Sequence, residues 1–126
     1  MNRKFDLEER LLDYTAAIIR FTENMRRTPA SIHVAGQLLR SGTSPLPNHG
    51  EAEAAESSAD FIHKMSICLK ELRETRRWLR LAQRVPLVSS TVVLDPLLRE
   101  NDELIRIFYT GIGTARKRIE GRKARA

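Results

Sequence analysis

The stretch LLRSGTSPLPNHGEAEAAES, residues 38–57, decides how many helices this chain forms. Both of its ends favour helix, but Pro45 and Pro47 lie between them. A proline inside a helix removes a backbone donor and clashes with the preceding turn, which costs about 3 kcal/mol. The four-three spacing of one helix face nevertheless continues past both prolines, at His49, Ala52 and Glu56. We therefore predict one bent helix over residues 29–56, distorted between residues 42 and 48; two helices with a true break are the alternative.

Three further segments, residues 6–26, 58–84 and 96–120, show the periodicity of amphipathic helices. Each follows a helix-start signal, and so does the bent helix, whose Thr28 precedes a proline. The other start signals are Asp6 with Glu9, then Ser57, then Asp95 with Pro96. Four such helices with short links predict an all-α fold, an antiparallel up-down-up-down four-helix bundle in a single domain.

Each predicted helix has one face that would line the core. In chain order these faces comprise Leu7, Leu11, Tyr14, Ile18, Phe21 and Met25; Ile32, Ala35, Leu39, Gly42 and Leu46; Phe61, Met65, Cys68, Leu72, Thr75, Leu79 and Ala82; and Leu98, Asn101, Ile105, Phe108, Ile112, Ala115 and Ile119. The connector VPLVSSTVVL, residues 85–94, is apolar enough to pack over one bundle end or against another subunit. Residues 121–126 are predicted to be a frayed basic tail.

The composition fits a globular chain with one core. Of its 126 residues, 41% are apolar and 30% are charged, and the single cysteine, Cys68, excludes an internal disulfide. No apolar run approaches the roughly 20 residues that span a bilayer, so we expect a cytoplasmic protein without a membrane partner. The net charge of +6 and the pI of about 10.1 favour attraction to polyanions such as RNA or DNA.

Three stretches carry a resemblance to a known family: FDLEERLLDY, QLLRSGTSPLPNHGEAEAAESSADFIHKMSICLKELRETRRWLRL and ENDELIRIF. They resemble the bacterial four-helix-bundle proteins called 23S rRNA intervening sequence proteins, or the S23 family. The similarity covers about residues 5–119. The residues that carry it are Arg40, Ser41, Ser44, Asn48, Glu51, Ala52, Ser57, Asp60, Phe61, Lys64, Leu69, Glu71, Leu72, Glu74 and Leu79.

The resemblance implies a homo-oligomer, a pentamer, with nucleic acid as the candidate ligand. The family is similar in fold to the accessory protein of diversity-generating retroelements. That protein is a basic four-helix bundle that assembles as a pentameric barrel and works with a reverse transcriptase and nucleic acid. A nucleic-acid enzyme such as a reverse transcriptase is therefore a candidate protein partner.

Arginines on the third predicted helix are the best functional signal. Arg73, Arg77, Arg80 and Arg84 step by four, three and four, so they form one stripe, with Arg76 nearby. Neighbouring like charges repel, so we expect an anionic group to face these arginines. One interpretation pairs Arg80 and Arg84 with carboxylates of an antiparallel fourth helix: Glu100, Asp102 and Glu103. The other is phosphate contact.

A second basic cluster lies at the carboxy end and comprises Arg116, Lys117, Arg118, Arg122, Lys123 and Arg125. Part of it complements the helix dipole, and the remainder predicts sequence-independent phosphate binding. Arg3, Lys4, Arg26 and Arg27 are weaker additions. Trp78 and Tyr109 could stack on bases, but a contact within the bundle or between subunits is the favoured interpretation for both.

No enzyme, metal site or cofactor is predicted. Asp60 with His63, and His49 with Glu53, fall short of the ligand set of a di-iron bundle. Polar residues beside the core faces indicate a network that fixes helix register or subunit contacts rather than a catalytic cluster; they are Arg40, Asn48, Glu51, Glu71 and Glu74. The predicted function is a non-enzymatic nucleic-acid-binding oligomer, and a protein-protein adaptor or structural ring is the alternative.

Overall fold

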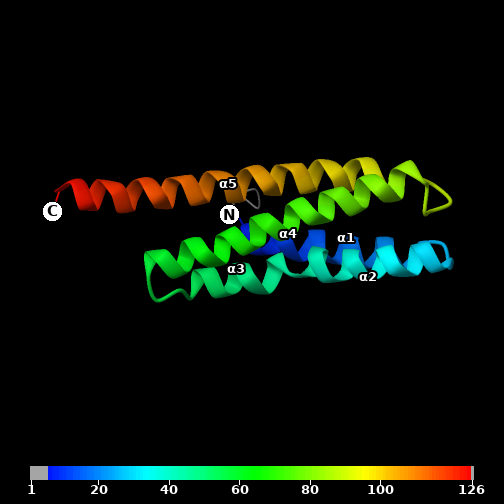
Figure 1. The fold of residues 1–126 in the computed structure, drawn as a ribbon, viewed down its shortest axis with the longest axis horizontal. Helices are drawn as coiled ribbons and strands as arrows, with labels where there is room; N and C mark the ends of the chain where they lie inside the picture. The colour runs from blue at the N-terminus through cyan, green and yellow to red at the C-terminus, as the bar shows by residue number, and fades with distance from the viewer. Residues whose placement is uncertain (1–5, 126) are drawn as a thin grey trace.

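The computed structural model describes residues 6–125, which form a bundle of antiparallel helical segments (Figure 1). The helices in chain order are α1 (Leu7–Glu23), α2 (Pro29–Thr43), α3 (Pro45–Glu53), α4 (Ser58–Arg84) and α5 (Leu94–Arg125). In Figure 1, α2 and α3 run on in one direction, antiparallel to α1 and to α4. Together α2 and α3 form the second of four helical legs. The predicted all-α four-helix bundle is thus confirmed.

A single residue, Ser44, separates α2 from α3, and its backbone stays right-handed helical with φ −66° and ψ −38°. Its carbonyl accepts from the backbone N–H of Asn48 at 3.3 Å and from the side-chain amide of Asn48 at 3.0 Å. Pro45 opens α3, where its missing N–H interrupts only one turn. The prediction that the two segments share one direction, with a bend and no true break between them, is confirmed. The helix ends at residue 53, three residues earlier than predicted.

Side-chain caps fix three of the helix starts as predicted. Asp6 accepts from the N–H of Glu9 at 3.1 Å, and Ser57 accepts from that of Asp60 at 3.0 Å. Thr28 caps α2 in the same way. At the other end of α1, the side chain of Asn24 donates to a backbone carbonyl, which ends the helix before the predicted residue 26.

Both ends of α5 differ from the prediction. The helix begins at Leu94, two residues earlier, because this fully buried leucine is drawn into the first turn and its N–H donates to the carbonyl of Thr91. The predicted frayed tail is wrong as far as Arg125, because Gly121 keeps a negative φ and the helix continues through it. Arginine, lysine and alanine favour helix, and Nε of Arg125 donates to the carbonyl of Gly121 at 3.2 Å.

The four legs form a square in which α1 and α4 are diagonal, since α1 packs on α2, α3 and α5, and α4 packs on the same three. A buried polar layer crosses the core. The side-chain amide of Asn101 donates to the Tyr14 hydroxyl at 2.8 Å and to the Leu72 carbonyl at 3.1 Å. Thr75 donates to Ser41 at 2.9 Å. This layer joins all four legs and fixes their relative heights.

The predicted core face is wrong on α2 by one residue. Ile32 and Leu39 are 64% and 39% exposed. The buried positions of α2 are Ser31, Val34, Leu38 and Ser41, together with the predicted Gly42. In α3 the predicted face is confirmed at His49 and Ala52, and Pro45 is buried as well. Ser31 and Ser41 take inward positions because they are hydrogen-bonded there, and Gly42 because it fits a close helix contact. On α4 the predicted face is confirmed from Met65 to Ala82.

The connector between α4 and α5 packs over one end of the bundle. Leu87 and Val88 are buried, and the carbonyl of Leu87 accepts from the backbone N–H of Arg26 at 2.9 Å. Further along, Val92 and Val93 are 77% and 56% exposed. The described helices include none with the length and apolar character of a membrane span.

Gly42 marks a close approach of α1 and α2. A Cβ added to it would lie 2.7 Å from Cγ2 of Ile18, whereas one added to Gly36 on the same helix would meet nothing within 4 Å. We expect Gly42→Ala to lower the free energy of unfolding by about 1–2 kcal/mol, because overpacking outweighs the gain in helix propensity. Gly36→Ala should raise it by about 0.5–1 kcal/mol. Denaturant titrations at equal protein concentration measure both, and equal increases would contradict the close approach.

Candidate nucleic-acid interface

A groove between α4 and α5 gathers arginines from both helices. Its lining residues are Arg73, Arg76, Arg77, Arg80, Asp102, Ile105 and Arg106, and they enclose a cavity of about 530 Å³. We call this the arginine groove. It forms because α5 lies antiparallel and closely packed on α4, so that one face of each long helix contributes a wall. Three of the four arginines in the predicted stripe line it.

The pairing of these arginines differs from the interpretation that placed acidic residues beside Arg80 and Arg84. Arg76, one position away from the stripe, takes Asp102, with Nε 2.7 Å from Oδ1. Glu100 and Glu103 pair with Arg10 on α1 instead. Within residues 6–125, no carboxylate lies within ion-pair distance of the four stripe arginines or of Arg106. The predicted pairing is therefore wrong, and the groove keeps an uncompensated positive charge.

A second compartment continues the groove toward the carboxy end of α5. It has a cavity of about 640 Å³ and is lined by Ser66, Leu69, Lys70, Arg73, Tyr109, Thr110, Ile112, Gly113, Thr114, Arg116 and Lys117. We call it the tyrosine compartment. Arg73 lines both spaces, so they adjoin. The stripe on α4 and the start of the carboxy-terminal cluster thus lie along one face.

The remaining predicted residues line neither space. Arg84 is exposed in the last turn of α4. Arg118, Arg122, Lys123 and Arg125 are exposed on the last turns of α5, which project beyond the rest of the bundle in Figure 1. After Ile112 no described residue of α5 is buried. This projecting end carries positive charge away from the bundle surface.

Two residues of these spaces, Arg106 in the arginine groove and Lys70 in the tyrosine compartment, were not predicted as contacts for nucleic acid. For Tyr109, also in the tyrosine compartment, base stacking was only the less favoured interpretation. Asp102, Arg106, Thr110 and Gly113 repeat at spacings of four, four and three, so they share a stripe on α5. That spacing could have revealed a second wall. What the sequence lacks is the register that sets this stripe opposite the arginines of α4.

Trp78 and Tyr109 have different surroundings. The indole N–H of Trp78 donates to Glu74 at 3.2 Å, and its ring meets His33 edge-on with centroids 6.2 Å apart. Trp78 therefore forms a contact within the bundle, which agrees with the favoured interpretation. Tyr109 is 65% exposed, and within the described chain its hydroxyl forms no hydrogen bond. Tyr109 is therefore not a contact within the bundle, and the other half of the favoured interpretation, a contact between subunits, stays a prediction.

Four of the five polar residues beside the core faces form contacts between helices, as predicted, whereas the side chain of Asn48 bonds to Ser44 within the second leg. Arg40 on α2 pairs with both Glu71 and Glu74 on α4. Lys64 pairs with Glu51 across α3 and α4, with Nζ 3.2 Å from Oε2. These ion pairs bind the second leg to α4 and support a structural role.

Two other reactive side chains, His49 and Cys68, are buried. Nδ1 of the buried His49 lies 3.6 Å from Oε1 of Glu53, just beyond hydrogen-bond distance. Burial raises the pKa of the Cys68 thiol to about 12, which leaves it protonated and unreactive at neutral pH. In the part of the chain that is described, histidine, cysteine, aspartate and glutamate side chains do not gather in threes that could hold a metal ion.

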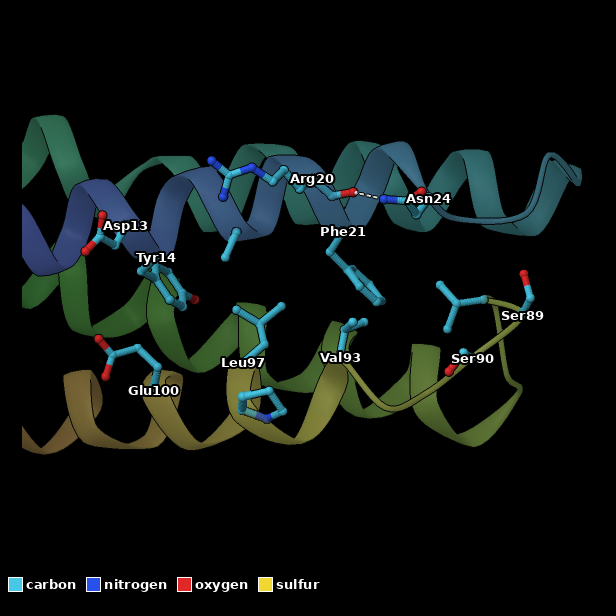
Figure 2. Close-up of a pocket in the computed structure, with 13 residues that line it drawn as sticks. Asp13, Tyr14, Arg20, Phe21, Asn24, Ser89, Ser90, Val93, Leu97 and Glu100 are labelled. Carbon is cyan, nitrogen blue, oxygen red and sulfur yellow. Dashed lines mark hydrogen bonds between the residues drawn. The ribbon is translucent and has the colours of Figure 1, made fainter.

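A third cavity, which is apolar and has a volume of about 590 Å³, opens between α1 and the start of α5 (Figure 2). Figure 2 shows Phe21 of α1 facing Val93 and Leu97, with Tyr14 and Glu100 further along. Arg20, Asn24, Val88 and two serines of the connector complete most of its wall. It exists because α1 touches α5 less extensively than it touches α2. Apolar surface of this kind suits a protein contact.

Comparisons with known proteins agree on one family. The family model of the 23S rRNA-intervening sequence protein matches residues 3–110. A crystal structure of a protein of unknown function from the S23 ribosomal protein family of Bacteroides thetaiotaomicron is similar to this chain, with 30% identity and a TM-score of 0.77. The match covers 83% of this chain and 96% of that one. No curated protein matches.

Proposed function

The chain belongs to the 23S rRNA-intervening sequence protein family, and from that premise we propose that it is a non-enzymatic, oligomeric helical bundle that binds nucleic acid. The ligand would lie along the α4–α5 face, with the projecting end of α5 as an additional contact. The family name concerns rRNA, and the proposal leaves both RNA and DNA as ligands to be compared.

The arginine groove is the observation that carries this proposal. Four of its arginines, Arg73, Arg77, Arg80 and Arg106, have no ion-pair partner among residues 6–125, although they line one cavity. Like charges at helical spacing repel by a few tenths of a kcal/mol per pair. A row of phosphates would relieve this repulsion and would accept the paired N–H groups that a guanidinium presents.

Assembly is the second part of the proposal. We propose that the chain forms a homo-oligomer, a pentamer as the family resemblance implies, and that it serves as an accessory factor to a nucleic-acid enzyme such as a reverse transcriptase. The apolar cavity beside Phe21 and the exposed Val92 and Val93 supply apolar surface for the contact between copies. Several copies would place several arginine grooves on one particle and so increase the affinity for a long polyanion.

Binding to RNA and DNA at increasing salt tests the proposal. The logarithm of the affinity should fall linearly with the logarithm of the salt concentration, with a slope of about −0.9 per phosphate contact on duplex DNA and about −0.7 on single strands. Light scattering before and after nuclease treatment gives the mass of the assembly and reveals co-purifying nucleic acid. Absence of salt-sensitive binding to every RNA and DNA at low ionic strength would refute the proposal.

The same apolar cavity favours the alternative, a protein-protein adaptor or structural ring. In that case the surface between α1 and α5 would bind another protein, and the positive groove would attract an acidic one. A pull-down that recovers one protein in stoichiometric amount after nuclease treatment, from a sample without salt-sensitive nucleic-acid binding, would favour the adaptor.

A further inference from the structure

The two spaces along the α4–α5 face differ in chemistry. In the arginine groove the cations are accompanied only by Asp102 and Ile105. In the tyrosine compartment, by contrast, Leu69 and Ile112 are buried, at 8% and 4% exposure, and form an apolar floor. Hydroxyl groups and four cations surround this floor: Ser66, Thr110, Thr114, Lys70, Arg73, Arg116 and Lys117. A ligand that fits both spaces must carry anionic groups and flat apolar groups in alternation.

Tyr109 gives the compartment a stacking surface. Its ring is 65% exposed beside this apolar floor, in a chain whose only tryptophan is used inside the bundle. Gly113, one turn further along α5, leaves open space beside it, since a Cβ at that position would meet nothing within 4 Å. A planar group could therefore approach the ring without moving the helix. Stacking of a base on an aromatic side chain requires this access.

We propose that the natural ligand is a single-stranded nucleic acid, with one base stacked on Tyr109 in the tyrosine compartment and the adjoining phosphates on Arg73 and the arginine groove. In a duplex each base is already stacked between its neighbours and paired, so it cannot reach the ring without being unstacked. The shared position of Arg73 suits the phosphate next to the stacked base. This inference deepens the proposed function and rests on it.

Affinity measurements on one strand in three forms test the proposal: the free single strand, its blunt duplex, and the strand with abasic sites, which keeps the phosphates. Fluorescence anisotropy with the full chain should show the tightest binding for the free single strand. Tyr109→Ala should weaken that binding by about 5- to 150-fold, the loss of one stacked base, and leave the duplex and abasic affinities unchanged. Tyr109→Phe should retain most of the affinity.

Ile32→Ala is the matched control, because Ile32 is 64% exposed on α2, away from the α4–α5 face, and its loss should leave all three affinities unchanged. Salt-sensitive binding that Tyr109→Ala does not weaken, or weakens equally for all three forms, would overturn the stacking inference and leave the proposed function intact. If the unmodified chain bound none of the three forms at low salt, both the proposed function and this inference would fall.

Discussion

Replacing Phe108 with alanine should lower the free energy of unfolding by about 3–5 kcal/mol, the usual cost of removing a buried phenylalanine ring. Phe108 is 0% exposed, and its ring meets the imidazole of His49 edge-on, with centroids 5.9 Å apart and planes at 82°. This contact joins α5 to α3, the diagonal pair of legs, so alanine would leave a cavity across the middle of the core. The expected fall in Tm is roughly 10–20 °C.

Tyr109→Ala supplies the control at the next position of the same helix. It removes a ring of similar size that is 65% exposed, so its effect on stability should stay within about 0.5 kcal/mol. Thermal and denaturant unfolding should be compared at equal protein concentration, because assembly makes Tm depend on concentration. Similar losses of stability from the two replacements would mean that Phe108 does not have the central place described above.

Helical periodicity predicted the core best where the core is apolar. On α4 the face from Met65 to Ala82 is buried as expected, because most of its aliphatic residues lie on one side. On α2 the rule that apolar residues face inward gave the wrong face. Ser41 is inside because Thr75 bonds to it, while Ile32 faces outward. Hydrogen bonds between helices determine such positions, and the pattern of a single helix does not contain them.

The candidate interface was predicted on one wall only. The arginine spacing on α4 is a property of one helix and is visible in the sequence. Whether a carboxylate faces each arginine depends on the height of α5 relative to α4. Asp102 pairs with Arg76, about one helical turn from Arg80, the partner that the sequence suggested. The same missing register concealed Arg106 and Tyr109. The bend at Ser44, by contrast, was predictable because proline acts through the local backbone.

Reversing two charges in the arginine groove should weaken nucleic-acid binding by roughly 10- to 100-fold, because a hydrogen bond from a charged group to a phosphate is worth about 1.5–3 kcal/mol when it is fully formed. The variant is Arg77→Glu with Arg80→Glu. Both side chains are exposed and have no ion-pair partner among residues 6–125, so the fold should persist. The salt slope should decrease in magnitude by about 0.7–0.9 for each phosphate that the variant no longer binds.

The decisive comparison is with Arg26→Glu and Arg27→Glu, two exposed arginines in the turn between α1 and α2. Each double variant exchanges two positive charges for two negative ones and lowers the formal net charge from +6 to +2. Attraction by net charge alone would therefore weaken both equally. A groove that holds phosphates requires a larger loss of affinity, and a larger change in salt slope, for the Arg77 and Arg80 variant. Equal losses of affinity would remove the groove as the binding site and reduce the interaction to the excess charge of the whole chain.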